Sequence, residues 1–224
     1  MGWGTEGEWF ERSMENFLII LFGVAMLFVA TTSRIEGYIN VLAAQGLLLF
    51  FLVLLDAPIL SFPALLFLAF ETLAIKTIAI PLFLRKIVRE HGLFREIEPY
   101  IPSFYSLFIT SLIFAFGFVI AYWESETANS VRALYFGISI ATIITGLFII
   151  ITRKKILTHV MGYMLLENGI FLLSLAIAKE MPFIVSLGVL LDIFAGIYLL
   201  GLFATQVQST FSEMNIDRLT NLKD

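Results

Sequence analysis

Residues 104–123 read FYSLFITSLIFAFGFVIAYW and contain no charged side chain. A run of about twenty apolar residues is the length that an α-helix needs to cross the hydrocarbon core of a bilayer. Tyr105 lies near the start of this stretch and Tyr122 and Trp123 end it, and such aromatic residues gather at membrane–water interfaces. A run of this length also favours a helix over the shorter alternating strands of a membrane barrel. We therefore predict a transmembrane helix here.

Similar apolar runs recur along the whole chain, which has 224 residues, of which 59% are hydrophobic and 14% charged. Soluble domains carry about 25% charged residues, so the bilayer rather than a water-excluding core is the expected solvent. We predict an all-α, polytopic integral membrane protein with about seven transmembrane helices. The predicted spans are 17–33, 37–56, 62–84, 104–123, 132–151, 156–178 and 182–207.

The basic residues predict how these spans are oriented, because cytoplasmic loops carry an excess of Lys and Arg. One side of the membrane receives three of them, namely Arg12, Arg132 and Lys179. The other side receives ten, namely Arg34, Arg85, Lys86, Arg89, Arg95, Arg153, Lys154, Lys155, Arg218 and Lys223. The N-terminus is therefore predicted outside and the C-terminus in the cytoplasm. The acidic, aromatic start of the chain lacks the basic residues of a cleaved signal peptide, so we expect it to remain at the interface.

A faint internal repeat suggests how the spans are grouped. Gln45-Gly46 matches Asn168-Gly169, and Glu71 matches Asp192, with offsets of 123 and 121 residues. Both three-helix units would then run in the same direction, as in a parallel repeat. The predicted units are an N-terminal interfacial segment (1–16), a three-helix unit (17–84), a cytoplasmic loop with a linking transmembrane helix (85–131), a second three-helix unit (132–207) and a cytoplasmic tail (208–224).

Four ionisable residues lie inside the predicted spans, namely Glu71, Lys76, Glu167 and Asp192. A charged residue at the centre of a membrane helix costs about 2.5–3.5 kcal/mol on insertion scales, so such residues face protein or water and usually mark ion pathways. We therefore predict that these four form or support an intramembrane proton pathway. The alternative is that each is neutralised by a structural contact with another helix or subunit.

The most complete arrangement is on the sixth span, where His159, Tyr163 and Glu167 follow one another at four-residue spacing. This spacing places the three side chains on one stripe of a helix. A histidine titrates near neutral pH, so the stripe could pass protons towards the membrane interior. The alternative is an interfacial histidine and a glutamic acid that only packs. The amides Asn168 and Gln45 are supporting candidates, although amides in membrane helices most often bond a neighbouring helix.

The other two spans give less complete patterns. Gly188, Asp192 and Gly196 share one face, which favours either a carboxylate at a close helix contact or a simple packing seam. Glu71 and Lys76 are five residues apart, about 140° around an α-helix, so we expect each to find its partner on another helix. Pro81 removes a backbone hydrogen bond close to Lys76 and is expected to loosen the helix there.

The sequence offers nothing that resembles an active site of its own. It has no cysteine, which excludes disulfides, thiolate zinc sites and iron–sulfur ligation. We find no phosphate-binding glycine loop, no cluster with metal-ligand spacing and no nucleophile beside a base, so we predict no catalytic residue, no metal site and no bound cofactor. A net charge of −4 without a basic surface gives no indication of nucleic acid.

Two segments, RKKILTHVMGYMLLENGIFLL (153–173) and GVLLDIFAGIYLL (188–200), resemble the membrane subunit hydrogenase-4 component E of formate hydrogenlyase and related membrane-bound hydrogenases. The resemblance extends to Gln45-Gly46, to AIKTIAIPLFL (74–84) and to the closing MNIDRLTNLKD. The last three spans are also similar to the NuoK or MrpC subunits of complex I and cation/proton antiporters. In that alignment Asp192 matches the acid of the third helix, whereas the acid of the second helix falls at Met164, three residues before Glu167.

This resemblance implies a non-catalytic subunit of a proton- or sodium-translocating oxidoreductase complex in a prokaryotic cytoplasmic (inner) membrane. The nickel–iron centre and iron–sulfur clusters would lie in peripheral hydrogenase subunits, and antiporter-like membrane subunits would be the neighbours. Two other classes stay open: a purely structural membrane subunit and a stand-alone secondary transporter.

Overall fold

The structure is a computed structural model that describes residues 6–32, 34–56, 62–90, 100–125, 130–154 and 156–177. Every regular element in these ranges is a helix, as the apolar runs predicted. The elements are α1 (Glu6–Thr31), α2 (Ile35–Leu55), α3 (Phe62–Phe70), the π-helix η1 (Glu71–Ala79), α4 (Ile80–Glu90), α5 (Ser103–Ser125), α6 (Ser130–Thr152) and α7 (Ile156–Ile177). Because α3, η1 and α4 follow one another without a break, they form one long helix.

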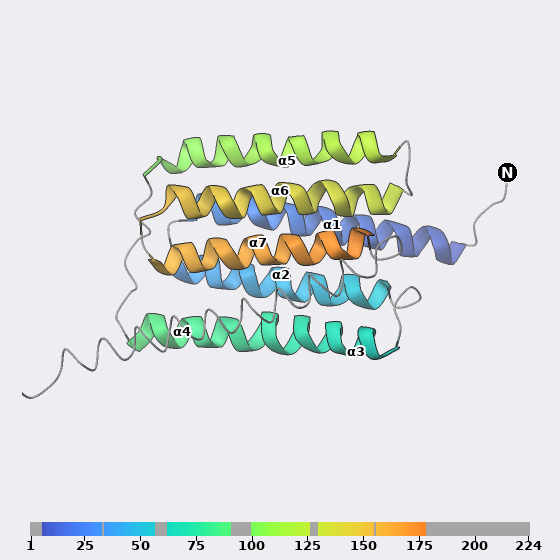
Figure 1. The fold of residues 1–224 in the computed structure, drawn as a ribbon, viewed down its shortest axis with the longest axis horizontal. Coiled ribbons are helices and arrows are strands. Elements are labelled where there is room, and N and C mark those ends of the chain that lie inside the picture. The colour runs from blue at the N-terminus through green and yellow to red at the C-terminus, as the bar shows by residue number, and fades with distance from the viewer. Residues whose placement is uncertain are drawn as a thin grey trace, which may run out of the picture.

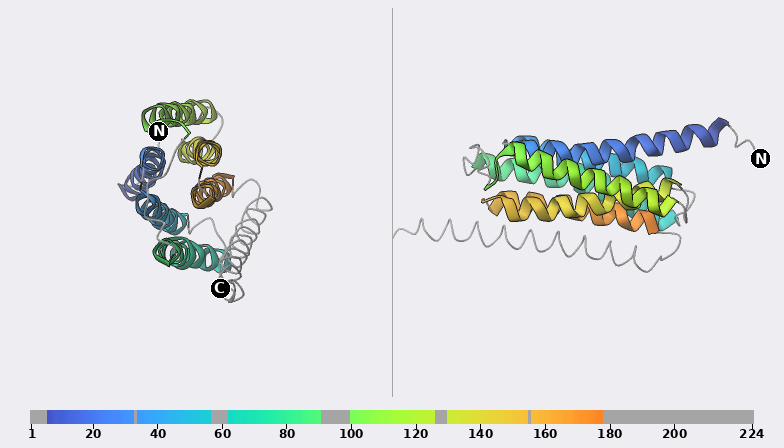
Figure 2. Two further views of the ribbon diagram at one scale, coloured as in Figure 1. Left: turned by 90° about the vertical axis from the view of Figure 1, so that its left-hand side faces the viewer. Right: turned by 90° about the horizontal axis from the view of Figure 1, so that it is seen from above.

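The helices run roughly antiparallel in chain order and pack as two layers of three (Figures 1 and 2). One layer holds α1, α2 and the α3–η1–α4 helix, and the other holds α5, α6 and α7. The layers meet where α1 contacts α5 and α6 and where α2 contacts α7. This arrangement places α2 and α7 in the interior and leaves α5 and the α3–η1–α4 helix at the two outer edges.

Six helices in the described part of the chain are long and apolar enough to cross a membrane. They correspond to the first six predicted spans, while the predicted seventh span (182–207) lies outside the described residues. The outer helices expose large apolar side chains, among them Phe67 and Phe108, as expected where a helix faces lipid. The chain is therefore a polytopic helical membrane protein.

Two helix ends differ from the sequence expectation. Helix α1 begins at Glu6, so most of the predicted interfacial segment (1–16) continues the first helix, which extends beyond its neighbours (Figure 2). Helix α4 continues to Glu90, although a loop was expected from residue 85. Basic residues near a helix C-terminus interact favourably with its dipole and extend their charged heads to water, so they do not end the helix.

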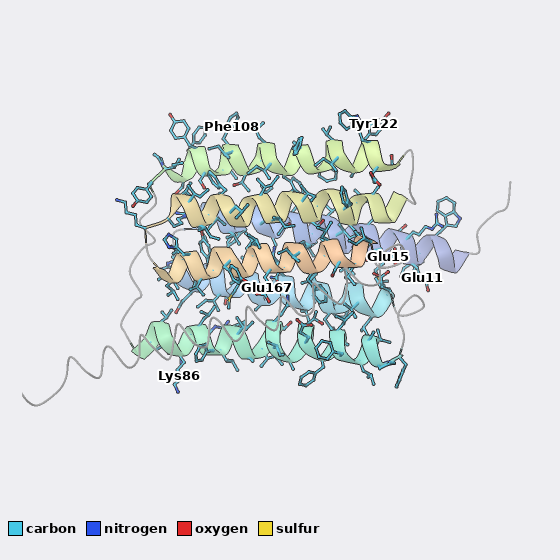
Figure 3. All side chains as sticks on the ribbon, in the orientation of Figure 1. Glu11, Glu15, Lys86, Phe108, Tyr122 and Glu167 are labelled. Atoms are coloured by element: carbon cyan, nitrogen blue, oxygen red, sulfur yellow. The ribbon has the colours of Figure 1, made fainter. Side chains whose placement is uncertain are left out.

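Most of the described basic residues gather at one end of the bundle, which we call the basic end, whereas Arg12 lies near the start of α1 at the other end and Lys76 lies in η1. Six lie at the basic end, at the start of α2, at the end of α4 and between α6 and α7, namely Arg34, Arg85, Lys86, Arg89, Arg153 and Lys154. The opposite end carries the acidic start of α1, including Glu11 and Glu15 (Figure 3). The asymmetry expected from the sequence is thus present in the fold, and the assignment of the basic end to the cytoplasm stays a prediction.

Candidate functional site

A layer of polar side chains crosses the middle of the bundle between two apolar clusters. The cluster nearer the basic end includes Leu42 of α2, whereas the cluster nearer the opposite end includes Leu48 of the same helix. Gln45 lies between them and is fully buried. Helices α7 and η1 contribute buried polar residues at the same level. We call this set the polar layer; it consists of Gln45, Glu71, Lys76, Glu167 and Asn168.

The polar layer contains a buried ion pair that joins η1 to α7. Lys76 Nζ lies 3.6 Å from Glu167 Oε1, and the two side chains are only 4% and 7% exposed. The ammonium also lies 4.8 Å from the centre of the Phe171 ring, within the range of a cation–π contact. Figure 3 shows Glu167 about half-way along α7. A charge at this depth is tolerated only when it is paired, so the contact accounts for the presence of both residues.

Two amide side chains extend the polar layer to α2 and α1. Asn168 Nδ2 donates a hydrogen bond to Gln45 Oε1 over 3.3 Å. Gln45 Nε2 donates in turn to the carbonyl oxygen of Phe22 over 3.5 Å. Because Asn168 follows Glu167 directly, the amide contacts and the ion pair lie next to each other and link four helices.

Glu71 and Lys76 lie on one side of their helix, so the expected 140° separation was wrong. The expectation assumed α-helical geometry, whereas residues Glu71–Ala79 form a π-helix, in which hydrogen bonds run from residue i to i+5. Positions five apart then lie above one another, and both residues are buried, each 5% exposed. The expectation that Lys76 finds a partner on another helix is confirmed by its contact with Glu167.

Pro81 gives this π-helix a local cause. Its missing N–H leaves the carbonyl of residue 77 without an α-helical donor. Inside the wide turns, the Thr77 hydroxyl donates to the Thr72 carbonyl oxygen over 2.8 Å, and the Ile80 N–H donates to the Ile75 carbonyl oxygen. Short π segments inside α-helices are frequent at functional sites, and this one carries two ionisable residues.

A glycine allows α2 to lie directly against the π-helix. A Cβ at Gly46 would lie 2.9 Å from Thr77 Oγ1 and 3.0 Å from the carbonyl carbon of Lys76. Any side chain at position 46 would therefore push η1 away from α2. The close approach keeps the backbone of Lys76 beside Gln45, which precedes Gly46 in the chain.

The predicted stripe on α7 leads from the basic end towards the polar layer. His159 and Tyr163 are partly buried, whereas Glu167 is buried. His159 Nε2 lies 2.6 Å from the carbonyl oxygen of Arg153, which fixes the ring beside the α6–α7 connection. Eight residues of α-helix span about 12 Å, so His159 and Glu167 do not touch and Tyr163 lies between them along the helix.

Arg153 is a buried residue that sequence reasoning missed. It was counted among the basic residues of a cytoplasmic loop, but it is only 2% exposed. Its Nη2–H donates to the Ala30 carbonyl oxygen over 3.0 Å, and its guanidinium carbon lies 6.0 Å from the centre of the Tyr38 ring. Arg153 thus caps the end of α1 and joins it to α2 and α7. In the sequence, only its position directly after an apolar run indicated that Arg153 could be buried.

The other predicted site residues, Gly188, Asp192 and Gly196, lie outside the described residues, so their part in the site stays a prediction. Among the described residues, no three His, Asp or Glu side chains come close enough together to hold a metal ion.

Comparison with curated proteins gives distant relatives. The chain is 26% identical over 148 residues to an uncharacterized protein, Rv0085, of Mycobacterium tuberculosis, covering 64% of this chain and 65% of that protein. It is 24% identical over 122 residues to hydrogenase-4 component E of Escherichia coli K12, covering 54% of this chain and 56% of the relative, and the same values hold for the Shigella flexneri protein. The chain thus spans between about half and two thirds of the length of the curated relatives it matches. No family model matches it, and no solved structure matches it significantly.

Proposed function

We propose that this chain is a membrane subunit of a multisubunit membrane-bound hydrogenase complex and that its polar layer contributes to an intramembrane pathway for protons or sodium ions. The main support for the pathway is the Lys76–Glu167 ion pair, which is buried between two apolar clusters in the middle of a helical membrane bundle. The distant similarity to hydrogenase-4 component E supports the assignment to a hydrogenase-type assembly.

The proposed assembly determines where the redox chemistry takes place. A nickel–iron centre and iron–sulfur clusters would be held by peripheral partner subunits, with this chain in a prokaryotic cytoplasmic membrane beside antiporter-like subunits. This chain would hold no redox centre itself. Its contribution would be to continue a line of buried ionisable groups between neighbours.

The polar layer offers a simple way to move charge. A proton that reaches Glu167 along the His159–Tyr163 stripe neutralises the carboxylate and weakens its attraction for the Lys76 ammonium. Glu71 lies one π turn away on the same side of η1 as Lys76, so it offers the released ammonium a second carboxylate. Lys76 would thus alternate between two carboxylates, and Asp192 would extend the path further in the C-terminal part of the chain.

The pathway is tested by replacing Glu167 with Gln in the intact complex. Glu167→Gln keeps the size of the side chain and removes its charge, and Glu11→Gln, at an exposed site on α1, is the matched control. We expect the Glu167→Gln complex to assemble and to translocate at least about tenfold fewer ions per turnover, as expected when a group that transfers protons is lost. A fully assembled complex with normal translocation would exclude this role.

A structural membrane subunit is the second candidate, because the ion pair and the amide contacts together join α1, α2, η1 and α7. In that case Glu167→Gln would reduce assembly, whereas any complex that still forms would pump normally. Blue-native gels followed by translocation assays on the assembled fraction separate the two outcomes.

A stand-alone secondary transporter is the third candidate, and purification distinguishes it. We expect an affinity-tagged chain, extracted in mild detergent, to bring down nickel–iron hydrogenase subunits and antiporter-like membrane proteins. A chain that purifies alone and exchanges an ion in liposomes would contradict the proposed assembly.

A further inference from the structure

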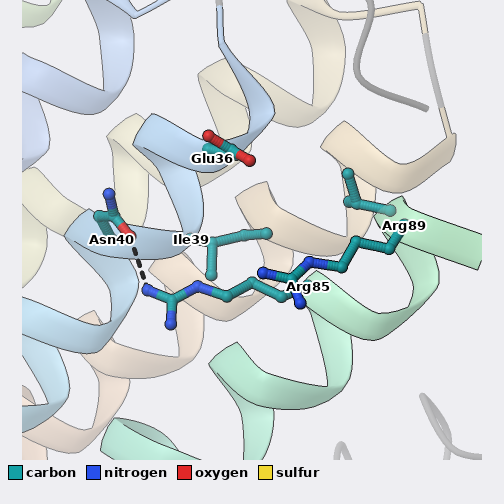
Figure 4. A pocket seen from close by; sticks show the side chains of 6 residues that line it. Glu36, Ile39, Asn40, Arg85 and Arg89 are labelled. Atoms are coloured by element: carbon teal, nitrogen blue, oxygen red, sulfur yellow. Dashed lines mark hydrogen bonds between the residues drawn. The ribbon is translucent and has the colours of Figure 1, made fainter. Parts of the chain in front are cut away.

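Two hollows meet at the basic end of the bundle on the side of α4. The first has a volume of about 230 Å³ and lies between α2 and α4 (Figure 4). Its lining consists of Glu36, Ile39, Asn40, Arg85, Val88 and Arg89. The second has a volume of about 360 Å³ and is lined by Leu82, Arg85, Lys86 and Arg89. Arg85 and Arg89 line both hollows. A ligand bound to their guanidinium groups could therefore extend into either hollow.

The charges of this site favour an anion. Its lining holds the two guanidinium groups of Arg85 and Arg89 against the single carboxylate of Glu36. Within the described part of the chain, Glu36 forms no ion pair with either arginine. Guanidinium groups offer several N–H donors in a fixed plane that matches the oxygens of a phosphate.

One guanidinium is already held in place. Arg85 Nη2–H donates to Asn40 Oδ1 over 2.8 Å (Figure 4), which directs the side chain towards α2. The neutral amide uses one donor and leaves the charge of Arg85 and its other donors for a ligand. Arg89 is exposed one turn further along α4, so the two guanidinium groups present donors on the same face of the helix.

An apolar stripe continues from the basic residues towards the centre of the membrane. Ile78 and Leu82 are 50% and 56% exposed and lie four residues apart, about one helical turn, across the junction of η1 and α4. Ile75, on the π-helix, is 42% exposed. The basic residues end this stripe where the helix leaves the hydrocarbon region. A free phosphate ion or an acidic peptide would use the basic residues alone. A phospholipid would contact the basic residues with its phosphate and the exposed apolar side chains with its acyl chains.

We propose that Arg85 and Arg89, with Asn40 holding Arg85 in place, bind the phosphate of an anionic phospholipid whose acyl chains lie along Ile75, Ile78 and Leu82. This lipid site is separate from the polar layer and does not depend on the proposed function. It would anchor the long helix at its basic end, next to the π-helix that carries Lys76.

The site is tested with the full chain purified in detergent and stripped of lipid. Phosphatidylglycerol is compared with phosphatidylcholine and with inorganic phosphate by native mass spectrometry and by the thermal unfolding midpoint. We expect phosphatidylglycerol to remain bound and to raise the midpoint, and the other two to do neither. Equal effects of both lipids, or of phosphate alone, would overturn the proposal.

Two double variants identify the residues. Arg85→Gln/Arg89→Gln removes the proposed site, and Arg34→Gln/Lys154→Gln removes the same charge from exposed positions at the same end of the bundle. Each basic residue near a lipid surface contributes about a factor of five in affinity. We therefore expect the first variant to bind phosphatidylglycerol about 25-fold more weakly and the second to bind it normally. Equal weakening in both variants would show that only the general charge of this end matters, which contradicts the proposal.

A measurement on the unaltered chain covers the case in which the first variant does not fold. A photoactivatable phosphatidylglycerol with its reactive group in the acyl chain should label peptides that contain residues 75–82. Adding a tenfold excess of unlabelled phosphatidylglycerol should abolish this labelling, whereas the same excess of phosphatidylcholine should not. Labelling confined to other helices would overturn the assignment.

Discussion

Replacing Lys76 with Met should destabilise the bundle strongly, because it leaves the Glu167 carboxylate in the interior without its cation. Lys76 Nζ and Glu167 Oε1 are 3.6 Å apart, and at an effective dielectric constant of about 20 two unit charges at that distance attract each other by about 5 kcal/mol. Breaking a buried pair by removing one partner costs about 3–5 kcal/mol in other proteins. We therefore expect Lys76→Met to lower the free energy of unfolding by about 3–5 kcal/mol. Glu167→Gln should lower it by less, because Glu71 offers the Lys76 ammonium a second carboxylate.

The double variant Lys76→Met/Glu167→Gln should recover most of this loss. Removing both charges also removes both desolvation penalties. Replacing a whole buried ion pair by uncharged side chains therefore often leaves the free energy of unfolding almost unchanged. We expect the double variant to unfold within about 1–2 kcal/mol of the unaltered chain, which gives a large coupling energy between the two positions.

Equilibrium unfolding of the full chain in mixed detergent and SDS micelles measures these free energies. Lys154→Met and Glu11→Gln, both at exposed positions, control for the loss of one charge. Each should change the free energy by less than about 1 kcal/mol, which for Lys154 includes its cation–π contact with Tyr100, 5.0 Å from the ring centre. Single variants at positions 76 and 167 that behave like these controls, with effects that simply add in the double variant, would refute the ion pair as a stabilising contact.

Three other substitutions test the surroundings of the polar layer. Gly46→Val should lower the free energy of unfolding by about 1–3 kcal/mol, because its side chain would overlap the backbone of the π-helix; an unchanged thermal midpoint would contradict this close approach. Thr77→Val should lower it by about 1 kcal/mol through loss of the hydrogen bond to the Thr72 carbonyl, which the same SDS titration measures. Arg153→Met should cost about 1–3 kcal/mol, because it leaves a buried carbonyl without its donor. The exposed neighbour Lys154→Met, which loses only a cation–π contact with Tyr100, should cost less than about 1 kcal/mol in the same titration.

The helices could be predicted from the sequence because lipid leaves the backbone few alternatives. An apolar run of about twenty residues must satisfy its own hydrogen bonds in a bilayer, so the six described helices follow from run length alone. Their ends do not follow in the same way. Polar residues such as Glu11 and Arg89 continue a helix into the interface, where the apolar signal has already ended.

The candidate site was only partly predictable. The rarity of charges in lipid was enough to single out Glu71, Lys76 and Glu167. The direction in which Glu71 points was not predictable, because it depends on the π-helix, and Pro81 indicated a disturbance without giving its form. The burial of Arg153 depends on the end of α1 lying beside the α6–α7 connection, a contact across 123 residues that no local pattern shows.

Ion translocation by the complex that carries Lys76→Met/Glu167→Gln tests the central claim most directly, because this variant removes both charges while it keeps the bundle stable. The complex is reconstituted in liposomes, and ion uptake is measured per molecule of hydrogen formed, beside a complex with Lys154→Met/Glu11→Gln. Our account predicts that both complexes assemble and that only the first loses most of its coupled ion uptake. Normal uptake per hydrogen in the first complex would contradict the account.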